Sequence, residues 1–264
     1  MNPSQEQLLP IPWRAEYVIL AISATLAVIY AYGQSNLNFI GTFSNAISPF
    51  EACAAFAMAA LLYKAQSGAR GGGMSRAYLS YSLGLLCWVL GESTWTLYSV
   101  LLQARVPFPS LADLFWLVGY IPLLLALLWQ AWPFRDWFNP RKRIMLSLGT
   151  CVMAAVILSQ TVPFILRQNE NALATIVGVA YPILDTLLLS VAIPVFILFR
   201  RGTYWRPMLF VLLGIMFQLI GDLLFAQSAL SGSYYPGSPA DLIFDFSYLL
   251  LALGFYKALK TNLE

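Results

Sequence analysis

Histidine is absent from this chain, and few of its 264 residues carry a charge. The lack of His excludes His-ligated haem, His-based zinc sites and Ser-His-Asp catalysis on this chain. No Lys falls in the middle of an apolar stretch, so a retinal-type Schiff base has no candidate. Charged residues make up 10% of the chain, against about 25% in soluble domains. A water-facing surface cannot be covered with so few charges.

Cysteine is scarce as well. The three cysteines, Cys53, Cys87 and Cys151, lie far apart inside apolar stretches. An odd, scattered set does not form a disulfide framework or a Cys metal site. We expect small, buried free thiols.

Long apolar runs are what the chain has in abundance, since 59% of its residues are apolar. Runs of about 18 residues or more can cross the roughly 30 Å of hydrocarbon in a bilayer as a helix. The sequence therefore predicts an all-α polytopic membrane protein with eight transmembrane helices. The first twelve residues contain no Lys or Arg, so we expect an uncleaved first span instead of a cleavable signal peptide. The predicted spans are 14–33, 46–65, 77–104, 111–132, 143–166, 172–200, 205–230 and 239–260.

Basic residues gather in alternate loops, which predicts the orientation in the membrane. The Gly-, Ser-, Asn- and Pro-rich segments 34–45, 104–110 and 228–238 are expected to be turns on the opposite side. Both termini should then be cytoplasmic, in the cell membrane. The loops after spans 2, 4 and 6 and the C-terminus carry Lys64, Arg70, Arg76, Arg135, Arg141, Lys142, Arg143, Arg200, Arg201, Arg206, Lys257 and Lys260.

The second half of the chain resembles the first at a nearly constant separation. Gly91 and Glu92 correspond to Gly221 and Asp222 at a separation of 130, and the separation becomes 128 beyond the intervening loop. We expect two parallel four-helix repeats, residues 1–132 and 133–264, related by an approximate two-fold axis along the membrane normal. The matches at 128 are Ser110, Ala112, Asp113, Leu114, Trp116 and Tyr120 with Ser238, Ala240, Asp241, Leu242, Phe244 and Tyr248.

Several acids lie within the predicted spans, where a charge is costly and marks a contact with protein or water. Glu92 lies 16 residues beyond Arg76, which is about 24 Å along a helix. Asp222 lies equally far beyond Arg206. The acids therefore fall in the half of the membrane away from the basic loops. Asp245 has no acidic counterpart, because Leu117 stands at its position in the first half.

Aromatic residues share helix faces with these acids at i, i+4 and i+7 spacing. One interpretation is an outward-opening pocket for a small cation or amine, held by charge pairing and cation–π contact. A proton-sensitive cluster and a hard metal ion with oxygen ligands are further possibilities. Purely structural hydrogen bonds between helices are the alternative. The candidate ligand-binding residues are Glu51, Glu92, Trp95, Asp113, Tyr120, Asp185, Asp222, Asp241, Asp245 and Tyr248.

Two stretches resemble a known family: GESTWTLYSVLLQARVPFPSLADLFWLVGYIPLLLALL at 91–128 and YPILDTLLLSVAIPVF at 181–196. They are similar to the N-terminal membrane regions of bacterial and archaeal sensor histidine kinases and diguanylate cyclases. The resemblance implies a sensory input module in which Glu92, Asp113, Asp185, Asp222 and Asp241 form the polar signature. This chain ends at Glu264 without a kinase or cyclase, so we expect a stand-alone member or one whose downstream domain has been removed. Gly221-Asp222 in an eight-span protein also resembles, more weakly, the membrane lysoplasmalogenases.

Four functions remain open from the sequence. The first is a sensor-like module that binds a small ligand or cation from the extracytoplasmic side and acts on a downstream signalling protein. The others are an accessory subunit of a larger membrane complex, a lipid hydrolase with an acid pair, and a secondary transporter. Membrane lipid is an expected partner. We expect no cofactor, and no nucleic-acid partner, because the net charge of +3 matches cytoplasmic loops that face anionic lipid.

Overall fold

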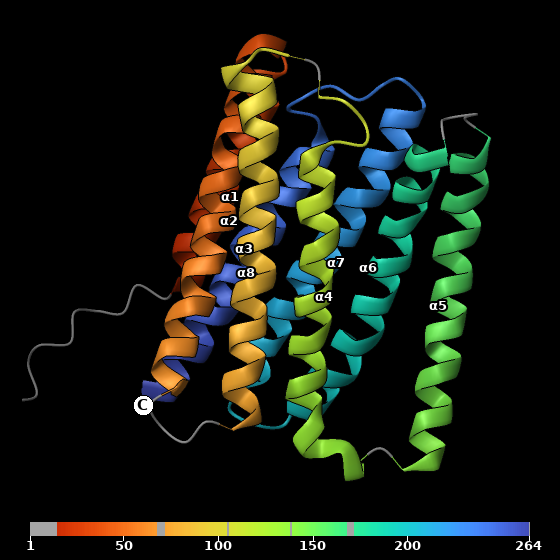
Figure 1. Ribbon diagram of the computed structural model, residues 1–264. Helices are drawn as coiled ribbons and strands as arrows, with labels where there is room; N and C mark the ends of the chain where they lie inside the picture. Colours follow the sequence, from red (N-terminus) through yellow and green to blue (C-terminus); the bar gives the residue numbers. More distant parts are fainter. Residues whose placement is uncertain (1–14, 68–71, 105, 138, 168–171, 264) are drawn as a thin grey trace, which may run out of the picture.

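The computed structural model describes residues 15–67, 72–104, 106–137, 139–167 and 172–263. All of the secondary-structure elements in this part of the chain are helices, joined by short turns and loops (Figure 1). A π-helical turn at Leu97–Leu101 follows α3, and a 3₁₀ segment at Trp132–Trp137 follows α4. The α-helices are α1 (Ala15–Gly33), α2 (Leu37–Ser67), α3 (Gly73–Thr96), α4 (Leu111–Ala131), α5 (Pro140–Leu166), α6 (Ala172–Phe199), α7 (Trp205–Leu230) and α8 (Pro239–Leu263).

Seven of these helices are long and apolar enough to cross a membrane: α1, α2, α4, α5, α6, α7 and α8. The remaining helix, α3, has 24 residues that include Arg76, Glu92 and several serines. It nevertheless runs beside α2 and α4 through the bundle (Figure 1). By helix length and hydropathy, the protein is an all-α, multi-pass membrane protein.

Successive helices run in opposite directions (Figure 1). The closest neighbours are α3 with α4 and α7 with α8. The first half of the chain, 1–132, is joined to the second half, 133–264, by contacts of α2 with α8, of α4 with α6 and of α1 with α8. The outer helices differ, since α1 packs on α8 whereas α5 packs mainly on α6.

Glycines allow α3 to approach α4 closely. A Cβ on Gly84 would come within 2.5 Å of Leu123, and one on Gly91 would come within 2.4 Å of the Trp116 indole nitrogen. Real Cβ atoms do not tolerate such distances, so only a residue without a side chain fits at either position.

The same arrangement holds α7 against α8. A Cβ on Gly214 would lie 2.7 Å from Leu251, and one on Gly221 would lie 2.5 Å from the Phe244 ring. These glycines stand 130 residues after Gly84 and Gly91, and their partners stand 128 residues after Leu123 and Trp116. The two helix pairs therefore share the same contacts at corresponding positions.

The start of α2 corrects one expectation. Segment 34–45 was expected to be a turn, but the helix already begins at Leu37. Asn36 accepts a hydrogen bond from the Phe39 backbone N–H, which caps the helix. Ile40 is fully buried, and Gly33 and Gly237 pack closely against it. Tertiary packing therefore overrides the turn-forming composition of this segment.

The cysteines correct a second expectation, because they are not all buried. Cys53 and Cys151 lie exposed on the outside of the bundle, and Cys87 is half-buried; all three are free thiols. On the outside of a membrane-spanning bundle an apolar thiol meets lipid, so exposure carries no solvation cost there.

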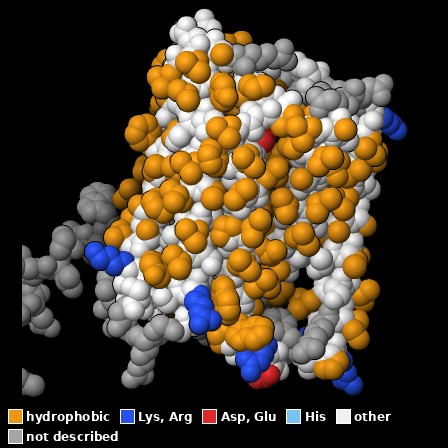
Figure 2. Space-filling model, viewed as in Figure 1, with side chains coloured by type: hydrophobic (Ala, Val, Ile, Leu, Met, Phe, Trp, Pro, Cys, Tyr) orange, Lys and Arg blue, Asp and Glu red, His pale blue; other side chains and the backbone are white. Residues whose placement is uncertain are grey.

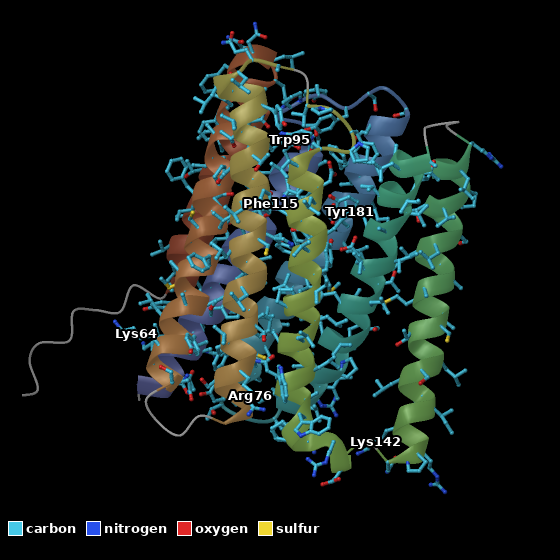
Figure 3. All side chains as sticks on the ribbon, in the orientation of Figure 1. Lys64, Arg76, Trp95, Phe115, Lys142 and Tyr181 are labelled. Carbon is cyan, nitrogen blue, oxygen red and sulfur yellow. The ribbon has the colours of Figure 1, made fainter. Side chains whose placement is uncertain are left out.

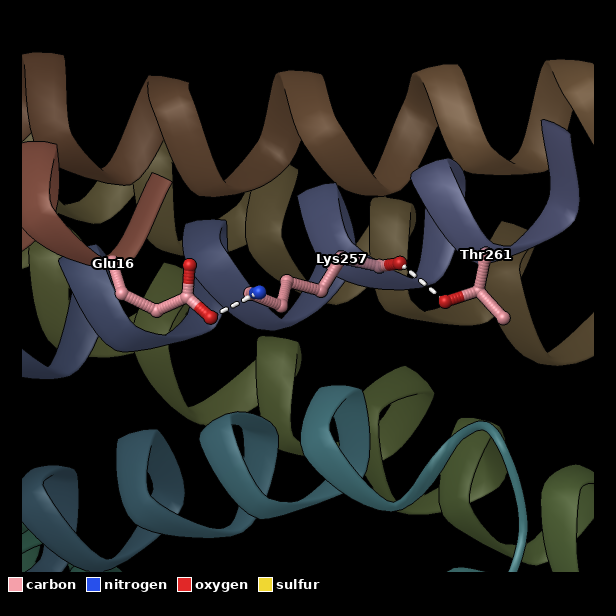
Figure 4. A network of polar contacts seen from close by, with 3 residues as sticks. All are labelled: Glu16, Lys257 and Thr261. Carbon is pink, nitrogen blue, oxygen red and sulfur yellow. Dashed lines mark hydrogen bonds and ion pairs between the residues drawn. The ribbon is translucent and has the colours of Figure 1, made fainter. Parts of the chain in front are cut away.

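Two polar contacts tie α1 to α8. Lys257 forms an ion pair with Glu16 near the C-terminal end of α8, where Thr261 also donates to the Lys257 backbone carbonyl (Figure 4). Farther along the helices, the Tyr30 hydroxyl donates to Asp245 at 2.6 Å. These contacts join residues more than 200 positions apart and hold the first helix against the last.

Candidate functional site

The predicted acids lie inside the bundle, mostly at helix–helix interfaces. Asp245 is 0% and Asp185 is 2% exposed, and Glu51, Asp113 and Asp241 are also buried. Glu92 and Asp222 are half-buried. Tyr181 and Trp95, which neighbour this region, lie in the upper half of the bundle, whereas Lys64, Arg76 and Lys142 lie at its lower end (Figure 3). Lys64, Arg76 and Lys142 therefore lie at the opposite end of the bundle from Tyr181, which donates to Asp113.

Asp113 caps the N-terminus of α4. Its carboxylate accepts hydrogen bonds from the Ser110 backbone N–H at 2.6 Å and from the Ser110 hydroxyl at 2.8 Å, which forms a capping box. The other oxygen accepts a hydrogen bond from Tyr181 on α6 at 2.9 Å. Asp113 thus stabilises its own helix start and ties α4 to α6.

Asp241 plays the corresponding part at the start of α8. It accepts hydrogen bonds from the Gly237 backbone N–H at 2.6 Å, from Ser44 on α2 at 3.3 Å and from Tyr234 at 3.2 Å. Burial, together with the neighbouring Asp241, raises the pKa of Tyr234 in the preceding loop, so its hydroxyl stays protonated and donates. A carboxylate is also favoured at a helix N-terminus by the helix dipole. Asp113 therefore caps α4, whereas Asp241 holds the loop before α8 in place and ties α8 to α2.

Tyr120 stands at the centre of the first carboxyl cluster, which we define as Tyr120, Asp185 and Asp222. Its hydroxyl donates to Asp185 on α6 at 2.6 Å and lies 3.3 Å from an Asp222 oxygen on α7. Both carboxyls therefore meet at one hydroxyl group, and one buried Asp185 oxygen has no hydrogen-bond partner in the described structure. Two ionised carboxylates this close would repel each other in a medium of low dielectric. The cluster is therefore an acid pair that shares a tyrosine donor.

Tyr248 makes the reciprocal contact from the other half. Its hydroxyl donates to Glu92 on α3 at 2.7 Å. Trp88 lies between the two tyrosines, with ring centroids 5.6 Å from Tyr120 and 6.1 Å from Tyr248. Each half thus supplies a tyrosine on its last helix to an acid on the third helix of the other half.

Asp245 belongs to a second carboxyl cluster, which we define as Tyr30, Ser48, Glu51 and Asp245. Tyr30 donates to one Asp245 oxygen at 2.6 Å, and Ser48 donates to the other at 3.2 Å. Glu51 lies three residues after Ser48 on the same face of α2, and one of its buried oxygens has no hydrogen-bond partner in the described structure. Leu117, at the corresponding position of the first half, cannot make such contacts, so this cluster breaks the correspondence between the halves.

Trp95 is engaged in packing and hydrogen bonding. Its indole N–H donates to Asn45 on α2 at 3.0 Å, and its ring contacts those of Trp116 and Phe225. The predicted shared face of Trp88, Glu92 and Trp95 therefore contacts α4 and α8 at Trp88, α8 at Glu92, and α2, α4 and α7 at Trp95.

Sequence reasoning did not single out several donors that complete the site. Ser44, Ser48 and Glu51 are spaced so that they share one face of a helix, which could have identified the two serines as donors near Glu51. Ser44, however, lies in the segment that the sequence predicts to be a turn. Tyr30 and Tyr181 carried no signal, because their partners lie on distant helices. The residues added by the structure are Tyr30, Ser44, Asn45, Ser48 and Tyr181.

Positive charge is missing around these acids. In the described segments, the ion pair present is the one between Lys257 and Glu16, and no described Lys or Arg pairs with any of the seven acids. No three of the described His, Cys, Asp or Glu residues converge with metal-binding geometry. A buried carboxylate without a counter-ion is costly, so a proton or a small cation would stabilise the carboxyl clusters.

Two cavities of the described chain are lined by none of the acids. One lies centrally among the apolar side chains of Leu85, Trp88, Leu123, Ile215 and Leu251. The other is an open groove on α1 and α2 between Val28, Tyr32 and Phe39. The tyrosine and serine hydroxyls instead close around the carboxyls. An occupant of the clusters must therefore be very small, or the helices must move apart to admit it.

Comparisons with protein-family models, curated proteins and solved structures returned no match to this chain.

Proposed function

We propose that the protein is a sensor-like membrane module in which the carboxyls between its two halves take up a small cation, a proton being the smallest, from the extracytoplasmic side. The observation that supports this most directly is the reciprocal crossing of Tyr120 to Asp222 and of Tyr248 to Glu92. These acids have no cationic partner among the described residues. The same groups that need neutralisation therefore also hold the halves together.

The physical link between occupancy and shape is electrostatic. If Asp185 and Asp222 were both ionised, two like charges would face each other beside the Tyr120 hydroxyl in a medium of low dielectric. The repulsion would act across the contact of α6 and α7, and Tyr120 would be left with two competing acceptors. A change in cation occupancy thus changes the packing between helices, as a sensor requires.

The orientation that we propose has eight spans, with α3 as the eighth, and both termini in the cytoplasm. Eight alternating helices support it (Figure 1), as does the position of Lys64, Arg76 and Lys142 at one end of the bundle (Figure 3). Basic residues favour the cytoplasmic side. The carboxyl clusters would then lie toward the extracytoplasmic side.

We also propose that the chain arose as two parallel four-helix repeats, 1–132 and 133–264. The matching close contacts support this, since Gly91 meets Trp116 as Gly221 meets Phe244. The reciprocal acid–tyrosine contacts are those that a two-fold axis between the halves would produce.

Ligand-dependent stability of the purified protein tests the proposed function. We expect the unfolding midpoint of the wild type to shift with pH, or with one of a panel of amines and mono- and divalent cations. Asp222→Asn should reduce the shift, because it removes one member of the acid pair. Asp136→Asn is the matched control, since Asp136 is exposed on the segment after α4. A wild type that responds to no condition would overturn the proposal.

A lipid hydrolase of the acid-pair type is a second candidate, favoured by the meeting of the Asp185 and Asp222 carboxyls at the Tyr120 hydroxyl. One carboxyl of such a pair can act as acid and the other as base. Turnover of a vinyl-ether lysolipid by the purified protein, abolished in Asp222→Ala, would establish it.

A further inference from the structure

Helix α1 packs on α8, but the corresponding helix α5 does not pack closely on α4. α1 is held on α8 by Tyr30 with Asp245 and by Glu16 with Lys257. In the described chain, α5 packs along α6 and touches α7, without comparable packing on α4. Asp245 anchors α1 on α8, but Leu117 stands at the corresponding position of α4. Helix α4 therefore lacks the acid that could hold α5, and its outer side is left uncovered.

A hollow is visible between α4 and α5 in the lower half of the molecule, surrounded by apolar side chains (Figure 2). Both helices carry apolar residues on their outside that no part of the described chain covers. On α4 these are Leu114, Val118, Ile121, Leu125 and Leu128, and on α5 they are Ile144, Met145, Leu148, Val152 and Val156.

Positive charge gathers where this hollow reaches the end of the bundle. Segment 135–143 joins α4 to α5 and contains four basic residues against one acid, Asp136. Arg135 lies over the exposed Trp132 ring at 5.4 Å, and Arg141 is exposed in the first turn of α5. Lys142 lies at the lower end of α5 (Figure 3). Cations in the first turn face the positive end of the helix dipole, so a nearby anion would relieve an unfavourable interaction.

We propose that this surface binds an anionic phospholipid, with an acyl chain in the hollow between α4 and α5 and the phosphate at Arg135 and Arg141. An apolar slot that ends in exposed arginines matches an amphiphile with a negative head. Tryptophan beside arginine is the combination expected at the level of lipid headgroups, and Trp132 with Arg135 provides it here. A helix from a second copy would fill the apolar slot without using the charges, so the anionic lipid accounts for both features.

Lipid retention by the purified full chain tests this proposal. Native mass spectrometry should show a dioleoyl-phosphatidylglycerol molecule that resists exchange with dioleoyl-phosphatidylcholine. Removing both charges in Arg135→Gln/Arg141→Gln should weaken phosphatidylglycerol binding by roughly 30-fold, at about a factor of five for each lost charge. Arg200→Gln/Arg201→Gln, in the exposed turn between α6 and α7, is the charge-matched control and should leave binding unchanged. Dihexanoyl-phosphatidylglycerol, whose tails are too short for the hollow, should bind at least about tenfold more weakly.

Each contrary result is decisive. Equal retention of the two dioleoyl lipids would remove the proposed selectivity for anions. Equal losses in the two double variants would show a general surface-charge effect instead of a site. Undiminished binding of the short-chain lipid would show that the hollow takes no acyl chain, and dimerisation that excludes lipid would identify a second copy as the occupant.

Discussion

At the scale of single residues, the protein satisfies buried carboxyls with hydroxyl groups instead of cations. Tyr30, Tyr120, Tyr181 and Tyr248 each donate to an acid on another helix. A tyrosine donor is neutral and largely apolar, so it can be buried at less cost than Lys or Arg. The arrangement keeps charge low in the membrane while each hydrogen bond still links two helices.

Tyr120→Phe should destabilise the protein by about 1–3 kcal/mol, because it leaves buried carboxyl oxygens without a donor. The loss should be smaller when Asp222→Asn is already present, since the two groups share one network. Unfolding in a detergent titration measures both effects. Tyr32→Phe is the control, as its side chain is 79% exposed. Equal destabilisation by Tyr120→Phe and Tyr32→Phe would show that the Tyr120 hydroxyl contributes nothing.

At the scale of helices, close pairing depends on small residues at fixed positions. Without a hydrophobic driving force between helices in lipid, close packing is a main source of stability. The α3–α4 and α7–α8 pairs each use two glycines for this purpose. The positions of these glycines, and the helices that carry them, could be predicted from the sequence. The residue that each glycine faces depends on how far the helices rotate and slide, and local sequence does not encode that.

Gly91→Ala should destabilise the bundle by about 1–3 kcal/mol, because the new methyl group would overlap Trp116. Gly221→Ala should act similarly through Phe244. Gly149→Ala on α5 has nothing within 4 Å and should be neutral or stabilising, since Ala favours a helix. Thermal unfolding of the three variants measures the difference. The described packing would be contradicted if Gly91→Ala and Gly149→Ala behaved alike.

At the scale of the whole molecule, polarity divides the bundle into a basic end and an end with carboxyl clusters. The proposed orientation predicts that a cysteine at Ser231 is labelled by a membrane-impermeant maleimide in intact cells. A cysteine at Thr203 should be labelled only after the membrane is permeabilised. Both positions are exposed in turns at opposite ends of the bundle, and the wild type supplies the background from its own thiols. Labelling of Thr203→Cys in intact cells would reverse the orientation.

The sequence by itself determined that the protein is an all-α, multi-pass membrane protein, and it located most of the helices. These properties follow from composition and hydropathy, so they need no knowledge of neighbours. Only the tertiary structure decided that Tyr181 meets Asp113, that Tyr30 meets Asp245, and that α5 stands away from α4. These hydrogen bonds join residues far apart in the chain, and they depend on which helix faces which. The physical reason is that an acid buried within a membrane needs a hydrogen-bonding partner, but the packing of the helices determines which residue that partner is.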